Sequence, residues 1–131
     1  MLVKDLMVPK EKLVTIDPLA NIREALKVMR TNHVKSLVVE RSNDHDAYGM
    51  LTFKNILYSI VASDGDIDLL RVYDLYSKPT IQLSGELDVK YAAQMMMKSS
   101  IKRILVIDNN QLQGILTMSD ILEAVMAKLD K

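Results

Sequence analysis

The chain has 131 residues, which is enough for one compact domain or for two small halves that share a core. Its 17 basic and 17 acidic side chains give a formal net charge of zero, which argues against nucleic acid as a partner, and the lack of cysteine excludes disulfides, thiolate chemistry and cysteine-based zinc sites. No apolar run approaches the ~18–20 residues that span a bilayer, and the N-terminus lacks the apolar stretch of a signal peptide, so we expect a cytoplasmic protein without membrane contact.

The first half of the chain predicts the order strand, helix, strand, strand, helix. It opens with an extended lead-in over residues 3–9, where Pro9 prevents a long helix. A helix is expected over residues 21–31, because Ile22, Ala25, Leu26 and Met29 recur at helical spacing and Asn21 with Glu24 forms a capping-box pattern. The other predicted elements are strands at residues 13–16, 36–40 and 48–52 and a second helix at residues 53–62.

The second half repeats this order after a connector rich in Asp and Gly. The connector covers residues 63–71 and is expected to hold a short helix at residues 67–71. Asp88 is the expected N-cap of a helix that runs to about residue 98, and Asn109 with Asn110 forms the expected turn between two strands. The predicted strands lie at residues 80–83, 103–107 and 113–117, and the closing helix at residues 118–128.

A duplication accounts for this repetition. The sequence GMLTFKNIL at residues 49–57 returns as GILTMSDIL at residues 114–122. Ile22, Ala25, Met29, Val34 and Leu37 align without gaps with Val89, Ala92, Met96, Ile101 and Ile104.

We therefore predict an α/β (α+β) fold of two pseudo-symmetric β-α-β-β-α repeats packed through their sheets. Repeat 1 covers residues 1–62, a linker covers residues 63–71, and repeat 2 covers residues 72–131. The first strand of each copy should pair in parallel with the next one, and the two later strands should pair antiparallel.

The duplicated motif places a threonine at a helix start. It consists of glycine, two apolar residues, threonine, two variable residues and then Asp or Asn. Glycine lacks a Cβ atom, so a ligand or a second backbone can approach the strand closely. Thr117 is the expected N-cap, where free N–H groups favour an anion, and Asp120 can accept hydrogen bonds from the two hydroxyls of a ribose. The same pattern is also close to a capping box, which needs no ligand.

These residues together resemble the CBS domain pair (Bateman module), a regulatory unit that commonly binds adenosine nucleotides. The resemblance covers about residues 3–126, and its most specific part is residues 114–122, supported by residues 5–7, 34–40 and 101–108. It implies two clefts, in each of which the Thr and Asp of one copy face residues after the first helix of the other copy. One nucleotide site is therefore expected at Thr117 for the phosphate and Asp120 for the ribose, with Val34, Lys35, Ser36, Met7, Val8 and Val14.

The second site implied by the resemblance departs from the family pattern. It comprises Thr52, Asn55, Ile101, Lys102 and Arg103. Asn55 replaces the aspartate, and an amide accepts fewer hydrogen bonds than a carboxylate, so we expect weaker ribonucleoside binding there. Lys102 and Arg103 lie where the family often places phosphate-binding cations, which favours a polyphosphate at this site.

The leading hypothesis is a non-catalytic regulatory module that binds an adenine nucleotide such as AMP, ADP or ATP and uses no catalytic cofactor. The alternatives are a protein-interaction scaffold with empty clefts and, more weakly, a sensor of S-adenosylmethionine or another adenosyl ligand. The resemblance also implies a homodimer and an effector protein of unknown identity. Candidates for the dimer interface, unless they are core residues, are Ile56, Ile60, Ile121 and Val125. His33 and His45 share no metal-ligand spacing, so no metal site or catalytic site is expected.

Overall fold

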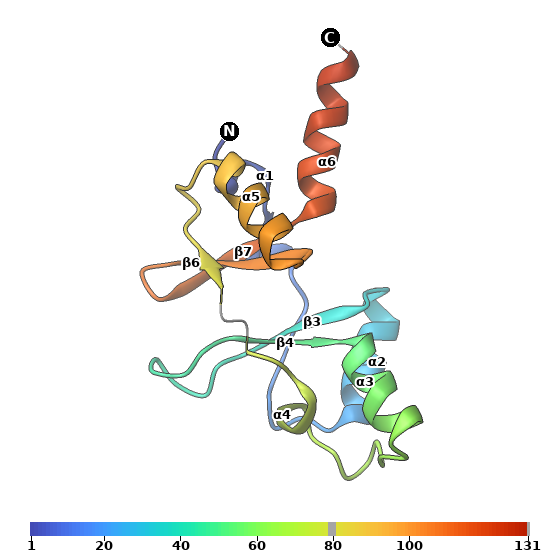
Figure 1. Cartoon of the computed structure of the whole chain (residues 1–131). Helices are drawn as coiled ribbons and strands as arrows, with labels where there is room; N and C mark the ends of the chain where they lie inside the picture. The colour runs from blue at the N-terminus through green and yellow to red at the C-terminus, as the bar shows by residue number, and fades with distance from the viewer. Residues whose placement is uncertain (79–80, 131) are drawn as a thin grey trace. The chain divides into compact units, whose positions relative to one another are not determined.

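The computed structural model describes residues 1–78 and 81–130 and contains two compact units. The central unit is Val14–Pro79, and the terminal unit combines Met1–Leu13 with Thr80–Lys131 (Figure 1). Each unit therefore contains the leading segment of one sequence copy and the body of the other copy.

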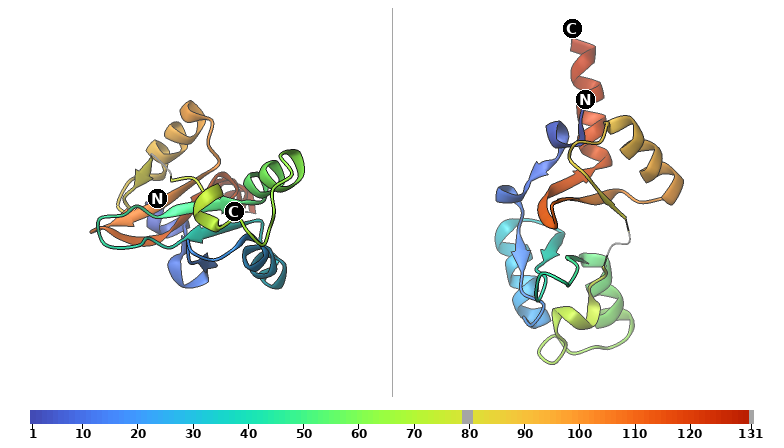
Figure 2. Two further views of the ribbon diagram at one scale, coloured as in Figure 1. Left: turned by 90° about the horizontal axis from the view of Figure 1, so that it is seen from below. Right: turned by 90° about the vertical axis from the view of Figure 1, so that its left-hand side faces the viewer.

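A small mixed sheet forms the middle of the central unit. Its strand order is β2–β3–β4, with β2 parallel to β3 and β3 antiparallel to β4, which confirms the predicted pairing. Helices α2 and α3 cover one face of this sheet (Figures 1 and 2). The elements are β2 (Thr15–Ile16), α2 (Ile22–Asn32), β3 (Ser36–Val39), β4 (Gly49–Thr52), α3 (Phe53–Leu57), the π-helical turn η2 (Tyr58–Ala62) and α4 (Val72–Leu75).

A side-chain hydrogen bond sets the start of helix α2, and the backbone conformation of one residue sets its end. The side-chain oxygen of Asn21 accepts a hydrogen bond from the Glu24 N–H at 2.9 Å, which confirms Asn21 as the N-cap. The helix ends at His33, whose φ of 54° lies in the left-handed region that stops a helix. Ile22, Ala25 and Met29 are buried, so the apolar stripe that predicts the helix is the face that packs on the core.

The core of the central unit lies between these helices and the sheet. Leu37, Val39 and Leu51 supply its sheet side, and Val72 of α4 is fully buried in it. The buried members are Ile16, Ala20, Ile22, Ala25, Met29, Leu37, Val39, Leu51, Ile56 and Val72.

The terminal unit has the same plan with one additional strand. Its sheet order is β1–β7–β6–β5, in which β5 is parallel to β6, while β7 is antiparallel to both β6 and β1. Asn109 and Asn110 form the turn between β6 and β7 with positive φ at both residues, as the sequence predicts. The elements are α1 (Val3–Leu6), β1 (Val8–Pro9), the 3₁₀ turn η1 (Lys10–Lys12), β5 (Gln82–Leu83), α5 (Val89–Ser99), β6 (Arg103–Asp108), β7 (Gln111–Thr117), α6 (Met118–Ala127) and the 3₁₀ turn η3 (Lys128–Asp130).

The core of the terminal unit matches that of the central unit. Helix α5 supplies an apolar face to one side of the sheet, and Val3 of α1 is fully buried beside it. The buried members are Val3, Leu83, Val89, Ala92, Met96, Ile104, Val106 and Leu116.

The two leading segments dock in the same way. The Val3 N–H donates to the Leu87 carbonyl at 2.8 Å in the terminal unit, and the Val72 N–H donates to the Ala20 carbonyl at 2.8 Å in the central unit. The boundaries expected from the sequence describe the repeat along the chain, whereas the packing groups each leading segment with the other body.

Some local expectations were wrong. Residues 3–9 are not extended throughout, because the Asp5 carboxylate accepts the Leu2 N–H at 2.9 Å and starts the short helix α1. The connector forms a turn at residues 67–69 instead of a helix, with the Asp66 carboxylate accepting the Asp68 N–H at 2.8 Å. Residue 80 of the expected strand at residues 80–83 lies outside the described residues.

Most of the expected dimer-interface residues are core residues. Ile56 is buried in the central core, Ile60 packs against it, and Ile121 packs against the terminal core. Val125 alone of the four is exposed. The apolar side chains that do reach the surface of these helices stand at neighbouring positions.

Candidate functional site

Thr117 and Asp120 cap the start of α6. The Thr117 N–H donates to Oδ2 of Asp120 at 3.0 Å, and the Asp120 N–H donates to Oγ1 of Thr117 at 3.1 Å. Both hydrogen bonds of a capping box are therefore present. Among the described residues, the second carboxylate oxygen of Asp120 and the hydroxyl proton of Thr117 have no partner. The cap leaves one acceptor and one donor available to a ligand.

Thr52 and Asn55 cap α3 with a different distribution of hydrogen bonds. Oδ1 of Asn55 accepts from both the Thr52 N–H and the Thr52 hydroxyl, each at 3.0 Å, and the Asn55 N–H donates to Oγ1 of Thr52 at 3.3 Å. The cap thus uses the amide oxygen and the hydroxyl proton. What remains on the Asn55 side chain is the amide nitrogen, which only donates.

The motif glycines make room for a neighbouring segment. A Cβ atom on Gly114 would overlap the carbonyl oxygen of Val8, because β1 pairs with β7 at this point. A Cβ atom on Gly49 would overlap the ring of Tyr76. Neither glycine has a positive φ, so the requirement is space for a second segment and not backbone conformation. At Gly114 the close neighbour is a second backbone, as one of the two sequence interpretations expects, and at Gly49 it is an aromatic side chain.

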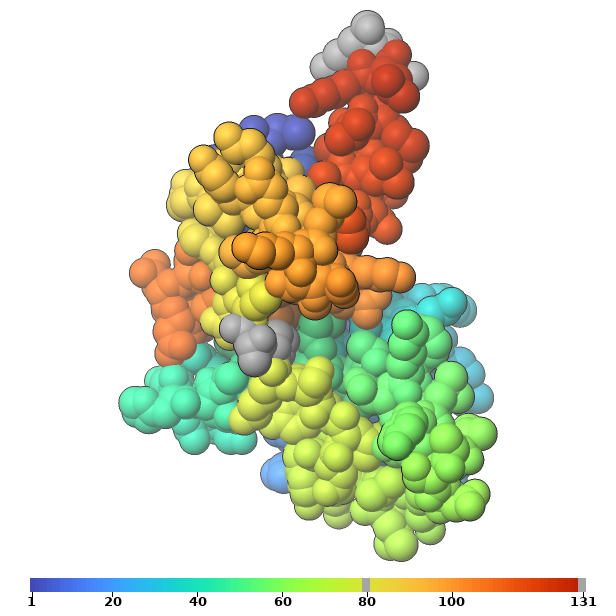
Figure 3. Space-filling view, viewed as in Figure 1, coloured from blue at the N-terminus to red at the C-terminus, as the bar shows by residue number. Residues whose placement is uncertain are grey.

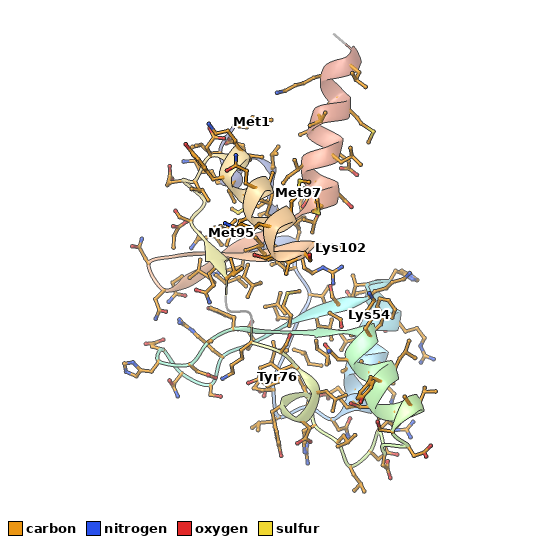
Figure 4. All side chains as sticks on the ribbon, viewed as in Figure 1. Met1, Lys54, Tyr76, Met95, Met97 and Lys102 are labelled. Atoms are coloured by element: carbon orange, nitrogen blue, oxygen red, sulfur yellow. The ribbon has the colours of Figure 1, made fainter. Side chains whose placement is uncertain are left out.

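Tyr76 and Ser77 have a structural role that the sequence analysis missed. Met50 and Ser77 exchange backbone hydrogen bonds, so the segment after α4 lies along β4 (Figure 4). The available signal was the alignment of Tyr76 with Met7, since both follow the matching segments that begin at Val72 and Val3.

The central unit brings Lys35 and Ser36 next to Thr52. Ser36 lies opposite Thr52 in the β3–β4 pair, and the Phe53 N–H donates to the Lys35 carbonyl at 2.9 Å. The Lys35 ammonium lies 5.7 Å from the centroid of the Phe53 ring. Val14 and Val34 are partly buried and pack against the core of this unit.

The terminal unit repeats this arrangement around Thr117. Arg103 lies opposite Thr117 in the β6–β7 pair, and the Met118 N–H donates to the Lys102 carbonyl at 2.9 Å, which places Lys102 just before β6 (Figure 4). Ile101 and Met7 pack against the core. Arg103 is exposed and is absent from the ion pairs of the described residues.

Each expected nucleotide site draws on both units. Of the residues predicted for the site at Asp120, Thr117, Met7 and Val8 belong to the terminal unit, and Val14, Val34, Lys35 and Ser36 belong to the central unit. Of the residues predicted for the site at Asn55, Thr52 and Asn55 belong to the central unit, and Ile101, Lys102 and Arg103 belong to the terminal unit. Within one unit the geometry is established, whereas the two groupings remain predictions.

Lowered carboxyl pKa values occur outside the repeated motif. The Lys78 ammonium holds the pKa of Asp46 below its usual range, the Arg23 guanidinium does so for Asp68, and the Ser84 hydroxyl does so for Asp108. The described residues contain no group of three or more His, Asp or Glu side chains that could hold a metal ion. None of their helices is long and apolar enough to cross a membrane.

These features define a class of proteins built from paired repeats. Each repeat has its own small mixed sheet and a threonine that caps the helix after the last strand. The chain belongs to the CBS domain family, which matches residues 3–62 and 72–127.

Similar proteins include both curated sequences and solved structures. The uncharacterized protein MK0525 of Methanopyrus kandleri is 27% identical over 117 residues, which cover 88% of this chain and 59% of that protein. The chain thus spans about three fifths of that relative's length. The hexameric CBS-CP12 protein from bloom-forming cyanobacteria is 33% identical with a TM-score of 0.81, over 93% of this chain and 66% of that one. The structure of CBSX2 in complex with AMP has a TM-score of 0.80 at 20% identity, over 96% of this chain and 97% of that one, which shows the shared fold.

Proposed function

We propose that the chain is a non-catalytic regulatory module that binds an adenine nucleotide, of the AMP, ADP or ATP kind, at Thr117 and Asp120. The observation that carries this proposal is that the α6 cap uses neither the second carboxylate oxygen of Asp120 nor the hydroxyl proton of Thr117. One carboxylate oxygen can accept a ribose hydroxyl proton, and the adjacent hydroxyl can donate to a phosphate oxygen. The AMP bound to CBSX2, a protein of the same fold, agrees with this ligand class.

The rest of the proposed site follows the family resemblance. Lys35 and Ser36 are assigned to the phosphate side, and the backbone near Met7, Val8 and Val14 to the adenine, with Val34 beside them. A second, weaker nucleotide site is assigned to Thr52, Asn55, Ile101, Lys102 and Arg103. At that position the free amide nitrogen of Asn55 cannot accept a ribose hydroxyl proton, which supports unequal affinities.

The proposed module acts through differences in affinity between two of its states. A ligand shifts an equilibrium only as far as it binds one conformation or assembly better than the other. The output is therefore a change in shape or association that an effector protein, still unidentified, recognises.

A second copy of the chain is the partner we assign to α6. Exposed apolar side chains form a stripe at helical spacing along α6 and η3, and they are Met118, Leu122, Val125, Met126 and Leu129. The C-terminal part of this helix extends beyond the rest of its own unit (Figures 2 and 3). An exposed apolar stripe of this kind marks an interaction surface, and the cyanobacterial relative is a hexamer.

Thermal-shift measurements with AMP, ADP, ATP and S-adenosylmethionine test the proposal. A ligand at 100 times its dissociation constant adds about 2.7 kcal/mol to the free energy of unfolding, which raises Tm by roughly 10 °C for a chain of this size. GMP is the matched control, because it carries the same ribose and phosphate with a different base.

The result also separates this proposal from a ligand-free scaffold. Both Thr-x-x-Asp/Asn sequences form capping boxes, which is what a scaffold needs from them. No rise in Tm with any of the four adenosyl compounds would favour the scaffold. A rise with S-adenosylmethionine alone would reassign the ligand.

A further inference from the structure

An open pocket of about 320 Å³ lies in the central unit, away from the repeated motif. It is formed by the turn between β2 and α2, the first turn of α2 and the residue that precedes α4. Its lining residues are Asp17, Leu19, Ala20, Asn21, Glu24 and Arg71. This volume is at the lower end of the range for small-molecule pockets.

Charged side chains of both signs line this pocket without pairing. Arg71 donates one guanidinium hydrogen bond to the Leu19 carbonyl at 2.8 Å, which leaves the rest of its planar fork available. One oxygen of Asp17 accepts the Leu19 N–H at 2.8 Å, and the other has no hydrogen-bond partner within residues 1–78 and 81–130. Among the described residues, neither Asp17 nor Glu24 forms an ion pair with Arg71.

The start of α2 does not supply anion-binding groups here. The Ile22 N–H donates to the Leu70 carbonyl at 3.0 Å, the Arg23 N–H to the Ile67 carbonyl at 3.1 Å, and the Glu24 N–H to Asn21. The first three N–H groups of the helix are therefore occupied. The positively charged group that this pocket offers to an anion is therefore the side chain of Arg71.

The terminal unit shows that the fold does not require Arg71. Leu2 pairs with Asp88 there as Arg71 pairs with Asn21 in the central unit, and both leading segments make the same backbone hydrogen bonds to their turns. Tyr91 stands at the position of Glu24, and Ser84 at the position of Asp17. One unit thus docks its leading segment with no charge at the Arg71 or Glu24 position, so these charges are free to serve a ligand.

We propose that this pocket binds a free α-amino acid. The ligand carboxylate pairs with the guanidinium of Arg71, in the planar geometry that arginine favours. The ligand ammonium lies between the carboxylates of Asp17 and Glu24. Leu19 and Ala20 provide an apolar wall, and the amide nitrogen of Asn21 is available to a polar side chain. This assignment is independent of the nucleotide site and of the proposed function.

Nuclear magnetic resonance of the ¹⁵N-labelled full chain tests the proposal. A pool of the twenty protein amino acids is added first, and the amino acid responsible is then titrated alone. We expect shifts at the backbone amides of Ala20, Asn21 and Glu24. The N-acetyl and the carboxamide forms of the same amino acid should each bind roughly tenfold more weakly or worse, because each lacks one charged group.

Two variants control for folding and for general surface charge. Arg71→Leu introduces the residue type found at the matching place in the terminal unit, so it should fold and lose the shifts. Arg30→Leu removes an exposed charge at the other end of α2 and should keep them. The proposal is overturned if the pool causes no shifts, if Arg71→Leu responds like the unmodified chain, or if either blocked form binds equally well.

Discussion

Asp120 forms part of the α6 cap, and we propose that it also binds the ligand. One of its carboxylate oxygens is used by the cap, and the other is assigned to the ribose. Replacement by alanine would remove both and would confuse lost binding with lost stability, since Asp120 accepts the Thr117 N–H in the capping box. Asparagine avoids this problem, because Asn55 forms the same two cap hydrogen bonds in the central unit.

Exchange of the two side chains should therefore exchange the two affinities. We expect Asp120→Asn to weaken AMP binding roughly tenfold, since a charged hydrogen bond is replaced by a neutral one or by none. We expect Asn55→Asp to strengthen the weaker site by a similar factor. Titration calorimetry measures the AMP affinities, and unchanged Tm values would show that the variants are as stable as the parent chain. Equal AMP affinity in the parent chain and both variants would remove the ribose assignment.

Gly114 tests the pairing of β1 with β7. A methyl group at this position meets the backbone carbonyl of Val8, which cannot move without breaking the strand pair. We expect Gly114→Ala to lower the free energy of unfolding by about 1–3 kcal/mol, as overpacking does. Gly49→Ala should lower the free energy of unfolding by less, because the added methyl group meets the ring of Tyr76. A side chain can move aside more easily than a paired backbone segment.

Urea unfolding monitored by circular dichroism measures these changes. Gln111→Ala is the control, because it alters an exposed position of the same strand and should stay within about 0.5 kcal/mol of the parent chain. A Gly114→Ala variant as stable as that control would mean that the Val8 segment does not lie on β7.

At the scale of elements, Asp108 ties the end of β6 to the turn before α5. The Ser84 hydroxyl donates to it at 2.6 Å and the Gly85 N–H at 2.9 Å, and with the nearby Lys4 ammonium these contacts lower the pKa of the carboxyl. A lowered pKa in the folded state adds stability above the unfolded value of about 3.9, and this contribution is lost as the pH falls toward the folded value.

Asp108→Asn should therefore destabilise the chain at pH 7 and have a smaller effect in acid. The measurement is urea unfolding of both proteins between neutral pH and about pH 3, below the unfolded pKa. The free-energy gap between them should narrow as the pH falls. A gap that stays constant across this range would show that the ionised carboxylate contributes nothing.

The sequence predicts most elements because each one rests on local signals. The stripe of Ile22, Ala25 and Met29 identifies α2, and the paired asparagines identify the turn between β6 and β7. Helices α2 and α5 end at His33 and Ser100, whose φ angles are positive. Neither residue is the glycine that usually marks such an end, so the sequence places these ends only approximately.

Other features depend on contacts between distant segments. The burial of Ile56 and the partial burial of Ile121 follow from packing against residues far away in the chain, and helical spacing cannot tell a core stripe from an interface stripe. The repeat at residues 49–57 and 114–122 predicts the motif. Only the cap geometry shows that Oδ2 of Asp120 accepts the Thr117 N–H, which leaves Oδ1 for a ligand.

At the scale of the whole molecule, association through α6 has a direct test. Leu122 is 56% exposed and Val125 is 52% exposed on this helix. We expect Leu122→Lys with Val125→Lys to lower the sedimentation mass toward that of one chain, because a buried charge opposes apolar association. Glu123→Lys, on the same helix, is the control for added charge. An assembly of the same mass in all three proteins would exclude this stripe as the interface.

We propose that an adenine nucleotide binds at the start of α6. The most direct measurement is a titration of AMP into the ¹⁵N-labelled full chain, followed by nuclear magnetic resonance. We expect saturable shifts that are largest at the amides of Thr117 and Asp120 and that extend to Met7 and Ser36. The absence of shifts at saturating AMP, or shifts confined to residues outside this set, would contradict this proposal.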